Sequence, residues 1–128
     1  MRLQPVSDPA GDTSISLILF LPDVDTTRQA LAAMQAEGVP AGGIYDHKVK
    51  DWHIYAYWEH ILGRKAVARD GLPWTGVARK DLPRYSKTMC PQTLDYLGRA
   101  VMLELNWQFS RRDCDALAAG INKVLARM

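Results

Sequence analysis

The feature that most constrains this chain is the apolar run SISLILFLPD, at residues 14–23, which Pro22 ends. A short apolar run of this kind predicts a strand that is buried on at least one face. Residues 1–13 contain two prolines and one glycine, and predict an extended lead-in to that strand. The fold is therefore expected to form around a sheet, with partner strands and covering helices supplied by the rest of the chain.

One helical pattern and one further strand pattern follow the run. Residues 26–38, TTRQALAAMQAEG, predict a helix with Asp25 as its N-cap and Gly38 as its C-terminal stop. The predicted core face of this helix consists of Ala30, Leu31 and Met34. Residues 41–47, AGGIYDH, then predict a short second strand.

The middle of the chain has a pattern that fits more than one structure. In residues 48–69 the apolar spacing fits a helical face, and we expect a helix or irregular cover there. That face consists of Ile54, Trp58, Ile61 and Leu62. The aromatic residues in the first half of the segment also fit a strand.

A basic segment spans residues 64–87. It contains seven lysines and arginines and two aspartates, so its net charge is +5. The total charge of the chain is +2, so the remaining residues carry −3. Its glycines and prolines predict a loop rather than a helix. Such a loop could hold an anionic ligand, whereas the alternative is a solvated surface loop.

The C-terminal third predicts a short helix, a strand and a long helix. In YSKTMCPQTLDYLGRAVMLELN, residues 85–106, Pro91 suits the first position of a helix that Gly98 ends. The strand follows at residues 100–106, and Ser110 and Asp113 form a capping-box pattern before the last helix. The apolar face of that helix consists of Cys114, Leu117, Ala118, Ile121, Val124 and Leu125. Cys114 is therefore expected in the core.

This order of elements predicts an α+β fold, a small antiparallel or mixed sheet with helices packed on one face. The 128 residues, 48% of them hydrophobic, fit a single domain spanning 1–128. With no apolar run long enough to span a bilayer and no signal-peptide core, we expect a cytoplasmic protein with reduced cysteines. The mild net charge favours neither a nucleic-acid nor a membrane partner.

No catalytic residue and no metal ligand is predicted from local motifs. Cys90 precedes a helix N-terminus, which lowers a thiol pKa, but no base lies near it in the sequence, so we interpret it as part of the helix start. His53 and His60 lie seven residues apart without the spacing of a zinc motif. The aromatic cluster at residues 52–58 fits either a ligand pocket or interface, or a cover over the core. Phosphate-binding glycine motifs are absent.

Three segments together resemble a known family. The sequences VSDPAGDTSISLILFLPD, DWHIYAYWEHIL and YSKTMCPQTLDYLGRAVMLELN are similar to the C-terminal small domain of the DegT/DnrJ/EryC1/StrS aminotransferases. These are fold-type-I enzymes that depend on pyridoxal phosphate (PLP), and many act on keto-sugars or inososes. The family signature falls on Cys90, Pro91, Thr93 and Arg99.

The resemblance implies that the catalytic machinery belongs to a large domain. In the family, that domain supplies the Schiff-base lysine, the phosphate cup and the aspartate that faces the pyridine nitrogen. None of the lysines here falls in the lysine motif, so no cofactor is expected on this chain and no catalytic residue is carried over. Because the small domain closes over the substrate side, the resemblance implies six ligand-facing residues: His53, Tyr55, Trp58, His60, Arg79 and Lys80.

Three functions follow from these observations. The first is a stand-alone or truncated small domain that is not catalytically competent alone and forms a homodimer or higher homo-oligomer through its exposed domain interface. The second is a non-catalytic binding module for a small anionic or sugar-like ligand. The third is an active enzyme, either through Cys90 or as one subunit of a split PLP aminotransferase that a separate large-domain chain completes.

Overall fold

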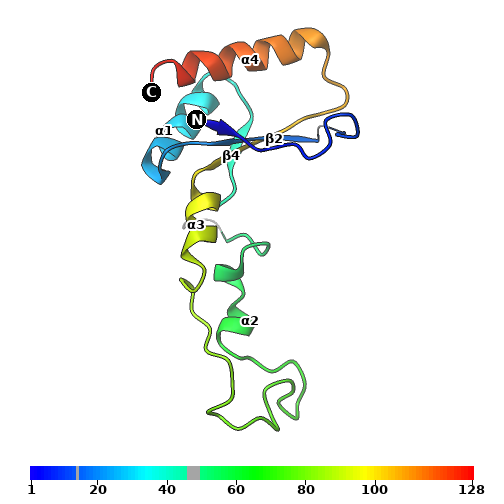
Figure 1. Cartoon of the computed structure of the whole chain (residues 1–128), viewed down its shortest axis with the longest axis vertical. Coiled ribbons are helices and arrows are strands. Elements are labelled where there is room, and N and C mark those ends of the chain that lie inside the picture. The colour runs from blue at the N-terminus through cyan, green and yellow to red at the C-terminus, as the bar shows by residue number, and fades with distance from the viewer. Residues whose placement is uncertain (14, 46–49) are drawn as a thin grey trace. The chain divides into compact units, whose positions relative to one another are not determined.

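A computed structural model describes residues 1–13, 15–45 and 50–128 of the chain (Figure 1). The chain divides into two compact units. Unit 1 comprises Met1–Asp46 and Asp95–Met128, and unit 2 comprises His47–Leu94. None of the helices in the described residues is both long and apolar enough to cross a membrane.

Unit 1 contains a four-stranded antiparallel sheet, which confirms the predicted α+β class. The strands are β1 (Arg2–Leu3), β2 (Ser16–Phe20), β3 (Ala41–Gly43) and β4 (Ala100–Glu104), in the spatial order β1-β2-β4-β3. The apolar run and the AVMLELN segment therefore form the two central strands, with Leu19 opposite Val101. The lead-in contributes a short strand, β1, which its prolines and glycine did not predict.

The first helix, α1 (Val24–Ala36), begins two residues earlier than its sequence pattern indicates. Its N-cap is Asp23, whose carboxylate accepts from the backbone N–H of Thr26 at 2.7 Å. The prediction that Asp25 caps this helix was wrong: Asp25 lies in the first turn and pairs with Arg28. Asp23 occupies the cap because its backbone is extended, as a cap residue requires.

The last helix, α4 (Arg111–Leu125), has the predicted capping box. The Ser110 hydroxyl accepts from the Asp113 backbone N–H at 3.3 Å, and the Asp113 carboxylate accepts from the Ser110 N–H at 2.8 Å. The prediction that Cys114 lies in the core was wrong, because its side chain is exposed. The helix meets the core only from Leu117 onwards, so its first turn lies beyond the packed region.

The core lies between one face of the sheet and the helices α1 and α4 (Figure 1). Side chains alternate between the two faces of a strand, and Leu19, Val101 and Leu103 point into this core. On the opposite face, Ile18 pairs with Met102, and both side chains are only partly buried. We call the face that carries Ile18 and Met102 the outer face of the sheet.

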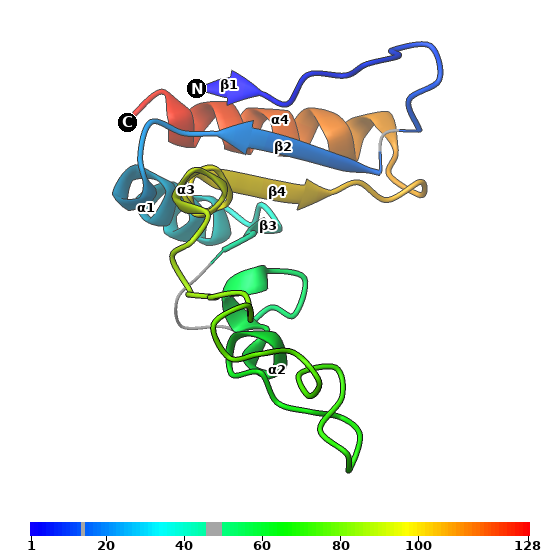
Figure 2. The ribbon, with the colours of Figure 1, turned by 60° about the horizontal axis from the view of Figure 1, so that its bottom comes forward.

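The short helix α3 (Pro91–Gly98) begins at the predicted proline and ends at the predicted glycine. Unit 2 contains the 3₁₀ turn η1 (Tyr55–Tyr57) and the one-turn helix α2 (Glu59–Leu62) (Figure 2). Residues 50–69 contain no strand, so the strand alternative for the described part of that segment was wrong. Residues 64–87 form neither helix nor strand, which agrees with the predicted basic loop.

Candidate functional site

The Tyr55 hydroxyl, which the resemblance places toward a ligand, has a structural role in unit 2. It donates to the backbone carbonyl of Lys87 and accepts from the backbone N–H of Cys90, both at 3.0 Å. These two bonds join η1 to the end of the basic segment. The tyrosine is therefore held in place by groups distant in sequence, which no local motif could predict.

The indole groups of unit 2 also bind backbone carbonyls. Trp58 Nε1 donates to the carbonyl of Trp52 at 2.6 Å, and Trp74 Nε1 donates to the carbonyl of Lys65 at 3.2 Å. The Trp74 ring packs edge-on against Tyr85. Trp58 remains 39% exposed. The aromatic cluster therefore organises the loop, while part of its apolar surface stays accessible.

The two histidines that the structure describes, His53 and His60, are exposed. The His53 ring lies 2.8 Å from the Asp51 carboxylate, and the His53 N–H donates to the same carboxylate and lowers the Asp51 pKa. His60 is exposed on α2. His47 lies outside the described residues. Within the part of the chain that is described, no three histidine, cysteine or acidic side chains lie close enough to share a metal ion.

Arg79 and Lys80, the two predicted ligand-facing cations, are exposed in the basic loop. Neither forms an ion pair with a described residue. Their role toward a ligand stays a prediction.

Glu59 in unit 2 is held in an ion pair and lies within electrostatic range of two further lysines, and sequence reasoning missed it. Lys50 Nζ lies 2.5 Å from a Glu59 carboxylate oxygen. The hydrogen bond and charge of Lys50 lower the Glu59 pKa, and the charges of Lys65 and Lys87 lower it further. These three lysines are spread over 38 positions of the chain. No local spacing therefore indicates that their charges act on the same carboxylate.

The four signature residues have different surroundings. Cys90 is a free, exposed thiol whose backbone N–H is bonded to Tyr55, and Pro91 is the first residue of α3. Thr93 is exposed on the same helix. Arg99 has the most contacts: its side chain is 20% exposed and pairs with Asp95 at 2.8 Å. It also lies over the Tyr96 ring, 5.1 Å from the centroid.

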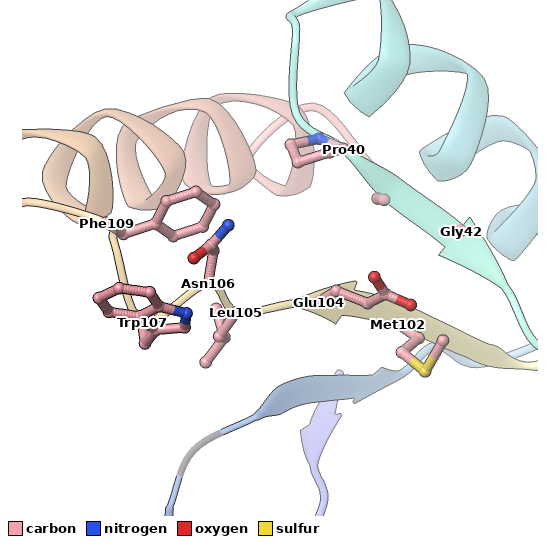
Figure 3. A pocket seen from close by; sticks show the side chains of 9 residues that line it. Pro40, Gly42, Met102, Glu104, Leu105, Asn106, Trp107 and Phe109 are labelled. Atoms are coloured by element: carbon pink, nitrogen blue, oxygen red, sulfur yellow. The ribbon is translucent and has the colours of Figure 1, made fainter.

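Unit 1 contains a groove of about 650 Å³ where β3 begins and β4 ends (Figure 3). Glu104 and Met102 project from β4, and Trp107 and Phe109 belong to the segment that follows it. At Gly42 an added side chain would meet nothing within 4 Å, so this glycine leaves the groove open. Trp107 is 90% exposed, which leaves a large apolar ring available for contact.

The chain matches no protein-family model, and no curated protein matches it either. In unit 2 the described groups offer exposed ammonium ions and aromatic edges, which bind and orient anions or sugars. Among the described residues, no histidine is hydrogen-bonded to Cys90.

Proposed function

We propose that this chain is a small-domain homologue of the DegT/DnrJ/EryC1/StrS aminotransferases that does not transaminate by itself and acts through assembly. The assembly is a homodimer or higher homo-oligomer, or a complex with a chain that carries the PLP domain. The three segments that resemble the family support this proposal. The α+β fold, with α1 and α4 on one face of an antiparallel sheet, is consistent with it.

The observation that carries the proposal is the outer face of the sheet. Ile18 and Met102 lie side by side on it without full burial. Exposed Trp107 lies beyond the end of the same strand, and the groove continues from Met102 toward it. Glu104 lies between Met102 and Trp107, so this surface combines apolar side chains with a carboxylate, as interaction surfaces often do.

Substitution on the outer face tests the assembly. We expect light scattering to show an oligomer for the unmodified chain, and Met102→Glu to shift it toward monomer because a buried unpaired carboxylate is costly at an interface. Gln29→Glu, on the exposed side of α1, adds the same charge elsewhere and should leave the oligomer intact. A monomeric unmodified chain that also fails to bind a PLP-domain chain would contradict the proposal.

Spectroscopy with added PLP tests the catalytic part of the proposal. Lysines on the surface react with PLP reversibly, so we expect the Schiff-base absorbance to disappear on dialysis. An absorbance that survives dialysis, with one lysine modified after borohydride reduction, would show that this chain carries its own cofactor site.

A further inference from the structure

The groove at the end of β4 contains a single charged side chain, the exposed Glu104. Glu104 lies two residues after Met102, so both project from the outer face of the sheet (Figure 3). Its neighbours across the strands are Ser16 on β2 and, by the register of β3, Pro40. Among the described residues, no cation forms an ion pair with this carboxylate. Its charge is therefore uncompensated on this face.

A turn holds the aromatic end of the groove. The Phe109 N–H donates to the Asn106 carbonyl, and the Gln108 N–H donates to the Asn106 side-chain oxygen, both at 2.9 Å. These bonds fix the backbone on both sides of Trp107, whose ring is 90% exposed. An aromatic ring presented on a fixed backbone loses little conformational entropy when a partner covers it. Trp107 is thus suited to contact an apolar group of another chain.

Glu104 determines what such a partner must carry. An interface that covers Met102 and Trp107 also removes water from the carboxylate that lies between them. Burial of a charge is costly unless an opposite charge pairs with it. The partner surface is therefore expected to present a cation next to an exposed apolar side chain.

Unit 2 of the same chain carries a surface of this kind. Val67 is 94% exposed, the highest value among the exposed large hydrophobic residues that the structure describes. The surrounding stretch, residues 64–70, has a net charge of +2, from Arg64, Lys65, Arg69 and Asp70. None of its three cations forms an ion pair with a described residue. The stretch is thus complementary to the groove in both charge and exposed apolar surface.

We propose, on the basis of the homo-oligomer proposed above, that the groove of one copy receives residues 64–70 of a second copy. Val67 packs on the Trp107 ring, and Arg69 pairs with Glu104. Arg69 is the arginine nearest to Val67 in the sequence, and a guanidinium matches a carboxylate through two parallel hydrogen bonds. Because the contact joins two different surfaces, it produces either a ring of copies or a pair in which both grooves are filled.

Charge reversal in the whole chain tests this contact, with self-association measured by sedimentation equilibrium over a dilution series at constant ionic strength. Glu104→Arg and Arg69→Glu each place like charges opposite one another, so each should weaken self-association by about tenfold or more. The double variant, Glu104→Arg with Arg69→Glu, restores a pair of opposite charges. It should recover the affinity of the unmodified chain to within about threefold.

Arg84→Glu is the matched control, because it reverses another exposed cation of the same basic segment that has no described ion pair. Its self-association should stay close to that of the unmodified chain. Equal weakening by Arg69→Glu and Arg84→Glu would show a diffuse charge effect and overturn the contact, as would a double variant that associates no better than the single ones.

The outcome also separates this contact from the proposed assembly. An oligomer that neither single reversal weakens would overturn the contact and leave the assembly in place. A monomeric unmodified chain would contradict self-association itself, and a complex with a PLP-domain chain would then be the remaining form of the assembly. Circular dichroism checks that each variant is folded.

Discussion

Arg99 and Leu21, 78 residues apart in the sequence, exchange two hydrogen bonds. The Leu21 N–H donates to the Arg99 carbonyl at 3.0 Å, and Arg99 Nη1 donates to the Leu21 carbonyl at 3.1 Å. The first bond extends the β2–β4 ladder by one residue pair. The second binds the Arg99 side chain to the backbone of the neighbouring chain segment at Leu21. The junction of α3 and β4 is thereby attached to the end of the apolar run.

Removal of the Arg99 side chain should destabilise unit 1. Arg99→Ala loses the bond to Leu21 and the contact with Tyr96, and leaves a partly buried carbonyl without its donor. We expect a loss of about 1–3 kcal/mol in the free energy of unfolding, measured by urea denaturation. Asp95→Asn keeps the Leu21 bond and removes only a surface ion pair, so it should cost less than about 1 kcal/mol. Equal costs for the two variants would show that the Leu21 bond contributes nothing.

The caps of α1 and α4 should make stability depend on pH in the acid range. Hydrogen bonds from Thr26 to Asp23, and from Ser110 to Asp113, hold the pKa of each carboxyl below its ordinary value. Because the pKa of each carboxyl is lower in the folded state, the stabilisation is fully present at pH values above the ordinary aspartate pKa of about 3.9. It is lost as the pH falls from there through the folded-state pKa.

The pH prediction is tested by urea unfolding between about pH 6 and pH 3, the range that brackets the ordinary aspartate pKa. The unfolding midpoint should be steady above about pH 5 and fall below pH 4. In the Asp113→Asn variant the unfolding midpoint should fall less steeply as the pH decreases, because this variant lacks the capping carboxylate that titrates. Asp115→Asn removes an exposed carboxyl of α4 outside the capping box, and should keep the slope of the unmodified chain. If the unfolding midpoint of Asp113→Asn had the same pH dependence as that of the unmodified chain, the pKa of Asp113 would not change on folding.

Cys114 should be dispensable for folding. Its exposed side chain makes Cys114→Ser a surface substitution, for which we expect a change within about 0.5 kcal/mol. In the folded chain both Cys90 and Cys114 should react with iodoacetamide, as followed by mass spectrometry. A core cysteine would instead be protected and costly to replace. Protection of Cys114 alone would support the helical-face prediction against the structure.

The local signals of unit 1 were readable from the sequence, because they depend on neighbouring residues. The capping box at Ser110, the proline that begins α3 and the alternation around Val101 each follow from local chemistry. Cys114 was misplaced because its helical spacing continues the apolar face, while the length of α4 that meets the sheet depends on tertiary packing. Asp23 was missed as a cap because it lies beside Pro22, where the strand signal ends.

The candidate site in unit 2 was harder to predict, since its contacts join distant segments. The two bonds of the Tyr55 hydroxyl and the bond from Trp74 to the Lys65 carbonyl depend on how the basic loop folds back toward η1 and α2. Hydrophobic periodicity does not predict how the basic loop folds, because residues 64–87 contain neither helix nor strand. Charge composition allowed either an anionic ligand or a solvated surface loop, and the structure adds the Lys50–Glu59 ion pair, which charge composition did not predict.

The two bonds of the Tyr55 hydroxyl join positions 32 and 35 residues apart, and so close most of unit 2 into one large ring. The entropic cost of closing a flexible ring grows only with the logarithm of its length, by about 0.6 kcal/mol for each doubling. Sequence inserted between Val77 and Arg84, after Trp74 and its two contacts, should therefore be tolerated while the tyrosine remains. This segment is where an added peptide tag or a grafted recognition sequence has the best prospect of being carried without loss of the fold.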